Sequence, residues 1–378
     1  MTPRERLDVV LRGGIPDCVP VAPDFSNMIP ARRTGKPFWD LYLYKDPPIW
    51  EAYIDTAKYF GIDAVMDGYF PLKFPSDKVP GEPEWEPFIV YRDTNRIITQ
   101  RSYLNNGQRI WEETVDVYYV ADPPTEGVSP DKVGLPAVPS TFEPLEGVRE
   151  VDLGAEGLKR VKSLMGDQGM VGIELISSRA LTSVEAIYAY YEHPELHEQW
   201  ARERVERVER RFRDLMEMEV RPDFICVGGS GTLVFQTLEI FRQLAYPAVK
   251  RGIELATEAG LYTHIHSCGP EKELVKLMAE ETGLTVIDPL EIPPMGDCDL
   301  AELKRLYGDR IVLKGNLHTT AVMLNPDVNV VIEASKRAID DAAAGGGFIL
   351  STGDQCGRDT PDENLFAMVE TARTYGRY

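Results

Sequence analysis

The chain has 378 residues, and its 41 Lys and Arg against 61 Asp and Glu give a formal charge of −20. With 43% hydrophobic and 27% charged residues, the composition excludes wholesale disorder and a collagen-like structure. The excess of carboxylates argues against binding to nucleic acid or anionic lipid, because both depend on Lys and Arg. No apolar run approaches the roughly 18 residues of a membrane span, and residues 1–8 lack the apolar stretch of a signal peptide. We therefore predict a cytoplasmic protein that binds neither nucleic acid nor membrane.

The first 150 residues combine two short apolar runs with a long interruption of another kind. Residues 18–22 and 63–67 are apolar runs of strand length, and a helical pattern over 49–60 precedes the second run. From about 71 to 150 the pattern changes to alternating apolar and polar residues around a turn sequence at 105–107. We therefore predict an antiparallel β insertion over about 71–150.

From residue 150 onward, short apolar runs alternate with helical patterns. The six apolar runs lie at 170–175, 223–227, 262–266, 285–288, 311–315 and 348–351. With the two upstream runs they make eight strands separated by helices, which is typical of a (β/α)8 barrel, although a doubly wound sheet with an extra lobe gives a similar alternation. We predict an α/β fold in which residues 1–378 form a single (β/α)8 TIM barrel domain with the β insertion and an N-terminal capping segment.

Active sites of such barrels lie at the carboxyl ends of the strands, where three side chains of this chain can bind a soft metal ion. His266 and Cys268 end the fifth predicted strand on the same face, and Cys356 follows the eighth strand, which a closed ring brings to the same mouth. A His-Cys-Cys set favours Zn2+, and three protein ligands leave the open fourth position of a catalytic site. The alternative, that the thiols are simply buried and His266 is a hydrogen-bonded core histidine, stays open on these residues alone. The other cysteines, which we expect to be packing thiols, are Cys18, Cys226 and Cys298.

The same residues carry a resemblance to a known family. The segment 266–269, the distal Cys356, the pair 315–316 and the C-terminal stretch 360–378 resemble the uroporphyrinogen decarboxylase superfamily, in particular its cobalamin-dependent methyltransferase branch. This resemblance spans most of the chain. It implies a barrel whose mouth holds a zinc ion through the three ligands named above. It also implies that the protein exchanges a methyl group with the cobalt of cobalamin on a separate corrinoid protein.

The resemblance implies a zinc-dependent methyltransferase that moves a methyl group between a small molecule and the corrinoid protein. We favour O-demethylation of a methoxylated aromatic, because the N-terminal part of the chain is rich in aromatic residues. One alternative is a methylcobalamin:thiol methyltransferase of the coenzyme M type, and another is a uroporphyrinogen decarboxylase-like decarboxylase. The decarboxylase branch has an arginine-containing N-terminal signature, whereas residues 22–33 have an acid and an amide in the matching place. A barrel that only holds a ligand at its zinc site, without turnover, stays open, as does the assembly of several copies.

Acidic residues that end or follow the predicted barrel strands are further candidates. Any of them can be a fourth zinc ligand, a partner that orients the histidine ligand, or a proton donor to a leaving group. We predict Glu174 and Glu291 as the catalytic acids. We expect Asp288 to pair with a barrel lysine or arginine, and Asp354 to cap its own loop. His264 lies deeper than the ligand histidine, so we expect it to be a hydrogen-bonded core residue.

Substrate contacts are expected from the N-terminal capping segment and from one residue after the seventh strand. The predicted contacts are Asp24, Phe25, Asn27, Met28, Tyr69 and His318. Ordinary packing of the aromatic residues is the alternative for most of that segment. The glycine-rich stretch 228–232 lacks the lysine of a phosphate-binding loop, so we expect no nucleotide cofactor.

Overall fold

The computed structural model describes residues 1–378, which divide into two compact units. The first unit contains residues 1–26, 57–77 and 153–378, and the second contains residues 27–56 and 78–152. The predicted insertion therefore belongs to the second unit only from residue 78 onward. Residues 27–56 belong to that unit as well.

Seven parallel strands of the first unit form one sheet in the order β1-β8-β9-β10-β11-β12-β13. The strands are β1 (Ala64–Met66), β8 (Gly169–Glu174), β9 (Phe224–Cys226), β10 (Tyr262–His266), β11 (Val286–Asp288), β12 (Val312–Leu317) and β13 (Phe348–Thr352). Each strand pairs with the next one along the chain, as repeated βα units require. The sequence prediction is confirmed at these seven positions.

The eighth predicted strand, residues 18–22, is not a full strand. Val21 forms one isolated parallel bridge with Leu350 of β13, and Ala22 N donates to Leu350 O at 2.9 Å. On the other side, Asp63 N donates to Val21 O at 2.8 Å. A regular ladder fails here because Pro20 has no N–H and Val21 N donates to the Asp63 side chain instead, at 2.8 Å. The segment still occupies the place between β13 and β1 with hydrogen bonds to both sides.

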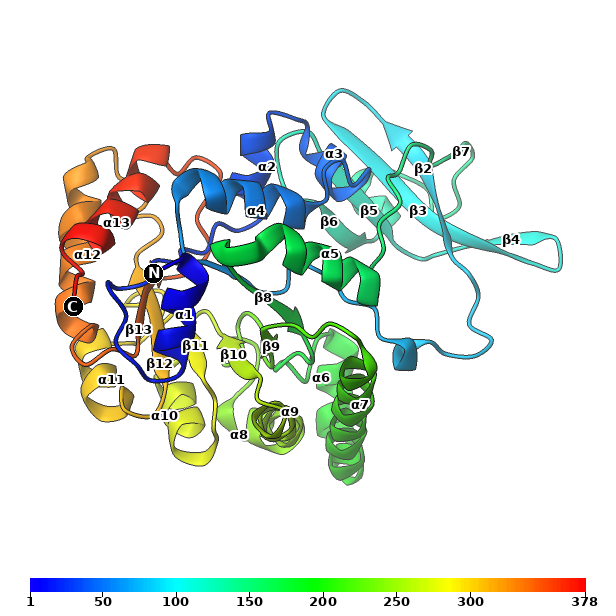
Figure 1. Cartoon of the computed structure of the whole chain (residues 1–378). Helices are drawn as coiled ribbons and strands as arrows, with labels where there is room; N and C mark the ends of the chain where they lie inside the picture. Colours follow the sequence, from blue (N-terminus) through cyan, green and yellow to red (C-terminus); the bar gives the residue numbers. More distant parts are fainter. The chain divides into compact units, whose positions relative to one another are not determined.

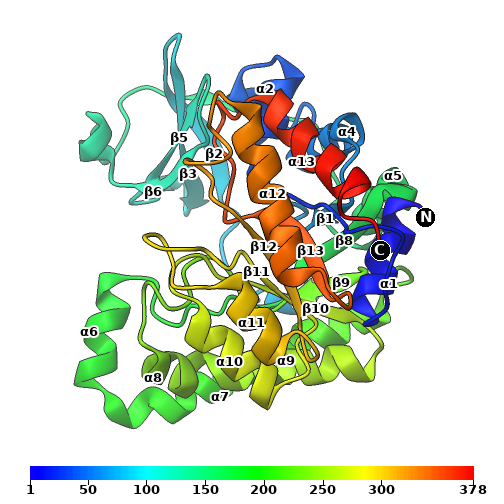
Figure 2. The ribbon, with the colours of Figure 1, turned by 90° about the vertical axis from the view of Figure 1, so that its left-hand side faces the viewer.

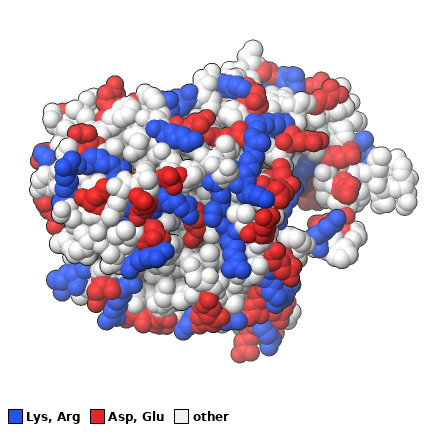
Figure 3. All heavy atoms as spheres, viewed as in Figure 1, with Lys and Arg blue, Asp and Glu red and all other residues white.

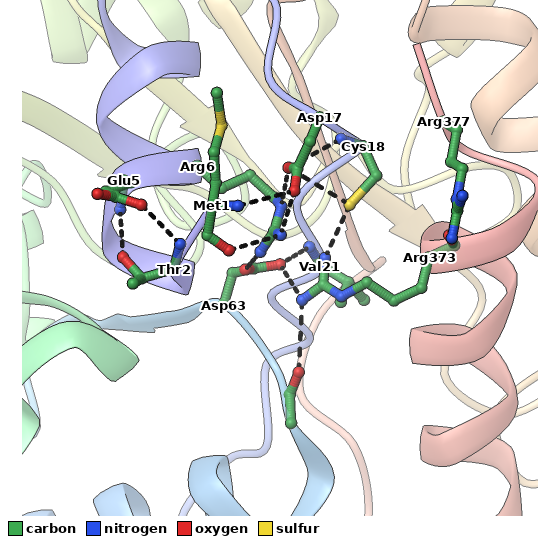
Figure 4. Close-up of polar contacts among 11 residues, drawn as sticks. Met1, Thr2, Glu5, Arg6, Asp17, Cys18, Val21, Asp63, Arg373 and Arg377 are labelled. Carbon is green, nitrogen blue, oxygen red and sulfur yellow. Dashed lines mark hydrogen bonds and ion pairs between the residues drawn. The ribbon is translucent and has the colours of Figure 1, made fainter.

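A buried carboxylate holds this segment in place (Figure 4). Asp63 is fully buried and accepts hydrogen bonds from Arg6 Nη1 at 2.6 Å and from Arg373 Nη2 at 2.8 Å, besides the one from Val21. Arg6 Nε also donates to the half-exposed Asp17 at 2.7 Å. These contacts tie together the first helix, the segment 18–22 and the last helix, so both ends of the chain meet at the same end of the sheet.

Helices of the first unit follow the strands and lie outside the sheet (Figures 1 and 2). They are α1 (Pro3–Leu11), α5 (Ala155–Met165), α6 (Val184–Glu192), α7 (His197–Glu217), α8 (Leu238–Ile240), α9 (Tyr246–Glu258), α10 (Lys272–Glu281), α11 (Leu300–Tyr307), α12 (Val328–Ala342) and α13 (Asp362–Thr374). The first helix packs differently, because Leu7 and Val10 of α1 lie against apolar residues of β8, β9, β11, β12 and β13. It closes the amino end of the sheet, which leaves the carboxyl end for a site.

The second unit contains a six-stranded antiparallel sheet and short helices. Its strands are β2 (Glu86–Arg92), β3 (Arg96–Asn105), β4 (Gln108–Trp111), β5 (Val115–Tyr119), β6 (Thr125–Val128) and β7 (Glu143–Pro144). Its helices include α2 (Met28–Thr34) and α3 (Phe38–Tyr42), while α4 (Ile49–Phe60) runs from this part of the chain into the first unit. Asn106 and Gly107 have φ of 50° and 83°, as the tight turn between β3 and β4 requires. The predicted antiparallel pairing and turn are confirmed.

The surface carries acidic and basic side chains side by side. In the view of Figure 3 they are interspersed over the visible face. None of the helices combines the length and apolar character that crossing a membrane requires.

Candidate metal centre

Two histidines of β10 meet one carboxylate at the end of β11. In the parallel register His264 lies beside Val286 and His266 lies beside Asp288. Asp288 Oδ1 is 2.9 Å from His264 Nε2 and 3.1 Å from His266 Nδ1. The other oxygen, Oδ2, forms an ion pair with Lys314 Nζ. This pairing confirms the expected lysine partner of Asp288.

The second ring nitrogen of His266 has no hydrogen-bond partner. Its Nε2 is buried and lies 3.5 Å from Asp354 Oδ1. His266, Cys268 and Asp354, here called the His266 group, each offer a ligand atom, and these atoms lie within 4.8 Å of one another. The contact with Asp288 directs the proton of a neutral ring to Nδ1, so Nε2 presents a lone pair to the group. A nitrogen, a sulfur and a carboxylate oxygen around an unsatisfied buried atom fit a zinc ion.

A second group of metal-ligand type lies deeper but is satisfied by its own hydrogen bonds. Asp67, Cys226 and His264 bring their ligand atoms within 4.8 Å. Both nitrogens of His264 have hydrogen-bond partners, Nε2 with Asp288 Oδ1 at 2.9 Å and Nδ1 with Cys226 Sγ at 3.9 Å. Burial raises the pKa of the Cys226 thiol well above its usual range, which disfavours the thiolate that a metal needs. His264 is thus the expected core histidine, and the His266 group is the better place for an ion.

The distal cysteine lies close by but outside the His266 group. Cys356 is completely buried, and burial raises the pKa of its thiol to about 12. Its backbone N donates to Asp24 O at 2.9 Å. Asp354, two residues earlier in the same loop, supplies the third ligand atom of the group and has a φ of 110°, which is rare outside glycine. A ligand role for Cys356 stays a prediction that requires its thiol to lose a proton.

The two predicted catalytic acids lie in different surroundings. Glu291 is buried, with 6% of its surface exposed, and its Oε2 accepts a hydrogen bond from Gly269 N at 2.5 Å. Burial raises the pKa of Glu291, and the neighbouring Asp354 acts in the same direction. Glu174 is exposed at the end of β8, beside Cys226 in the strand register. The structure therefore places Glu291, and not Glu174, beside the residue that follows Cys268.

The predicted substrate contacts of the first unit are bound to other residues of that unit. Burial raises the pKa of Asp24 to about 6, and its Oδ1 accepts a hydrogen bond from Ser26 N at 2.7 Å. Tyr69 donates from its hydroxyl to Ser26 O at 2.7 Å. Phe25 is fully buried, with its ring centroid 5.5 Å from that of Phe60. Their role in binding substrate stays a prediction.

The remaining predicted contacts lie elsewhere. Asn27 and Met28 belong to the second unit, where Met28 packs against a cluster of buried residues from α2, α3 and α4. His318, just past β12, lines a cavity of about 390 Å³ together with residues of α11 and α12. Its Nδ1 accepts hydrogen bonds from Thr320 N at 3.2 Å and Ala321 N at 3.3 Å, so Nε2 carries the proton of the neutral ring.

Two buried charged residues were not singled out from the sequence. Lys314 lies in the middle of β12, and a lysine inside an otherwise apolar run is a signal that points to a buried acidic partner. Glu271 follows Gly269 and Pro270, is completely buried, and accepts from Leu290 N at 2.9 Å through Oε2. Its Oε1 has no partner, and burial raises its pKa well above the usual range. No pattern in the sequence distinguishes this glutamate from an ordinary residue at the start of a helix.

Comparisons with known proteins agree with this architecture. Residues 220–375, from before β9 to the end of α13, match the Uroporphyrinogen decarboxylase (URO-D) family. A curated uroporphyrinogen decarboxylase from Dechloromonas aromatica (strain RCB) is 30% identical over 79 residues, which cover 21% of this chain and only 22% of that protein. The solved structure of a methyltransferase from Methanosarcina mazei is similar with a TM-score of 0.62 and 17% identity, covering 99% of both chains. At that identity the likeness establishes a shared fold.

Proposed function

From the match of residues 220–375 to the uroporphyrinogen decarboxylase family, we propose that the chain is a zinc-dependent methyltransferase. The observation that carries the proposal is the unsatisfied Nε2 of His266, which faces Cys268 and Asp354 while Nδ1 is held by a buried carboxylate. This arrangement is the one expected of a metal-binding histidine. The fold shared with a methyltransferase supports the choice of reaction.

The residues around the His266 group suit a divalent cation. When bound there, zinc supplies Lewis-acid chemistry to the oxygen or sulfur atom at which the methyl group is exchanged. His266, Cys268 and Asp354 would hold it, with Cys356 as a further ligand if its thiol loses a proton. Cys356 is completely buried and His266 is 9% exposed, and this burial strengthens electrostatic interactions on that side of the site.

Glu291 is the proton donor in this proposal. If the substrate is a methyl ether, the oxygen that loses its methyl group gains negative charge and needs a proton. A raised pKa increases the protonated fraction of a carboxyl group, which is the form that donates the proton. The hydrogen bond from Gly269 N occupies Oε2, which leaves Oε1 to carry the proton.

The substrate and partner follow from the resemblance of the sequence to the cobalamin-dependent branch. We propose a methoxylated aromatic as methyl donor and a separate corrinoid protein as acceptor, with cobalamin bound to that partner. A thiol of the coenzyme M type, methylated by methylcobalamin, is the alternative substrate for the same site.

Decarboxylation of a porphyrinogen is the second candidate, because the family match and the curated relative both carry that name. A substrate with several carboxylates needs cationic partners. Three acids, Asp288, Glu291 and Asp354, lie around the His266 group, and Lys314 is already paired with Asp288. This surplus of negative charge favours a cation and a neutral substrate over a polycarboxylate.

An anaerobic assay tests the reaction. The purified protein is mixed with a reduced corrinoid protein and a panel of methoxyarenes, methylamines and methylthiols, and the cob(I)alamin absorbance is followed. Loss of cob(I)alamin with a methoxyarene supports the proposal, and demethylation of methylcobalamin by a thiol supports the alternative. If neither occurs while a porphyrinogen releases CO2, the decarboxylase is the correct function.

A further inference from the structure

A continuous chain of buried contacts runs from the centre of the sheet to the His266 group. Lys314 pairs with one oxygen of Asp288, and the other oxygen contacts both His264 and His266. Asp288 is 1% exposed, His264 is 2% exposed and Lys314 is 4% exposed. Of these four residues, only His266 belongs to the proposed set of metal ligands.

Burying these charges is costly, so the arrangement needs a reason. Taking a carboxylate and an ammonium out of water costs several kcal/mol per ion, and an apolar pair of similar volume is often at least as stable. The residues of β11 and β12 that precede Asp288 and Lys314 are Val286, Ile287, Val312 and Leu313, so the start of these strands does not require an ion pair. What the pair does provide is an ionised carboxylate at a fixed position beside His266 Nδ1.

Lys314 compensates the buried carboxylate directly. Its Nζ forms an ion pair with Asp288 Oδ2, while Asp288 Oδ1 lies 2.9 Å from His264 Nε2 and 3.1 Å from His266 Nδ1. A carboxylate in this position accepts the Nδ1–H of His266, which fixes the ring orientation and leaves Nε2 as the ligand atom.

We propose that Asp288 and Lys314 are positioning residues for the metal centre: Lys314 holds Asp288 in place, and Asp288 orients His266 so that Nε2 faces Cys268 and Asp354. This inference rests on the proposed metal site and adds two residues that touch neither the ion nor the substrate. It also accounts for a lysine inside an apolar strand.

Zinc affinity tests the inference, measured by competition with a chromogenic chelator on the purified full chain. Loss of a partner that orients a metal-binding histidine typically weakens metal binding 10- to 100-fold. We expect Asp288→Asn and Lys314→Met to raise the zinc Kd by at least tenfold, and Lys314→Arg to restore most of the affinity. In the Co2+-substituted protein, Asp288→Asn should also shift the visible absorption bands, since the ligand geometry changes.

The matched control is Asp63→Asn, which removes another fully buried carboxylate that pairs with cations at the other end of the sheet. It should lower stability without changing the zinc Kd, and so separates a general loss of stability from an effect on the metal. If Asp288→Asn does not fold, Lys314→Met and its comparison with Lys314→Arg decide the question. If the wild type and both variants bind zinc with the same Kd, this inference alone is wrong. If the wild type binds no zinc, the proposed metal site is wrong as well.

Discussion

Replacing Asp63 with asparagine removes the charge that joins both ends of the chain to the sheet. Asp63 has no exposed surface and accepts hydrogen bonds from Arg6 Nη1 at 2.6 Å, Arg373 Nη2 at 2.8 Å and Val21 N at 2.8 Å. Each of the two bonds to a charged donor contributes about 1.5–3 kcal/mol. Breaking a buried ion pair by removing one partner costs about 3–5 kcal/mol when the other charge stays buried without compensation. Arg6 keeps its bond to Asp17 and Arg373 is 24% exposed, so we expect Asp63→Asn to lower the free energy of unfolding by about 3 kcal/mol, the lower end of that range.

The assay is urea denaturation followed by far-UV circular dichroism, with Asp17→Asn as the control. Asp17 binds the same Arg6 but is 42% exposed, and exposed ion pairs contribute at most about 1 kcal/mol. Hydrogen exchange should show the same difference at Val21 N, whose acceptor is Asp63. If the two variants lose equal stability, or if Asp63→Asn loses less than about 1 kcal/mol, the account of how residues 18–22 are held is incorrect.

Two further predictions concern pH and a glycine. Burial acts to raise the pKa of Asp223, but hydrogen bonds from Arg4 and Lys162 lower it below the usual range, so its contribution to stability is present above about pH 4 and is lost as the pH falls. The stability difference between wild type and Asp223→Asn should therefore be largest near pH 7 and shrink below pH 4; a difference that grows on acidification would contradict this assignment. Gly269 has a φ of 90°, and a Cβ there would lie 2.3 Å from Val234 Cγ2, so Gly269→Ala should destabilise the protein by about 1–3 kcal/mol in thermal unfolding and weaken zinc binding. An alanine variant with wild-type melting temperature and zinc affinity would show that this turn tolerates a side chain.

The alternation of strands and helices was predictable because each βα unit carries its own periodicity. Seven strands lie where the apolar runs predict them, and the turn at 105–107 closes the expected hairpin. The segment 18–22 is apolar but contains Pro20, which removes a donor, and a side chain from residue 63 takes the next N–H. Such a competition between a backbone ladder and a distant carboxylate leaves no trace in local sequence.

The candidate site was predictable where ligands are close in sequence. His266 and Cys268 end one strand, so their meeting follows from strand geometry. The partner from the last loop was harder to predict, because Asp354 and Cys356 lie two residues apart and only the path of the loop decides which of them faces His266. Lys314 carried a signal in its apolar strand, although its partner could be known only from the pairing of β11 and β12.

The metal content of the purified protein tests the central claim most directly. Elemental analysis of wild type, His266→Ala and Cys268→Ala is compared with that of Cys226→Ala, which alters the deeper, satisfied group. We predict about one zinc per chain in the wild type and in Cys226→Ala, and a large loss in His266→Ala and Cys268→Ala. Equal zinc content in all four proteins, or none in the wild type, would contradict the proposed metal centre.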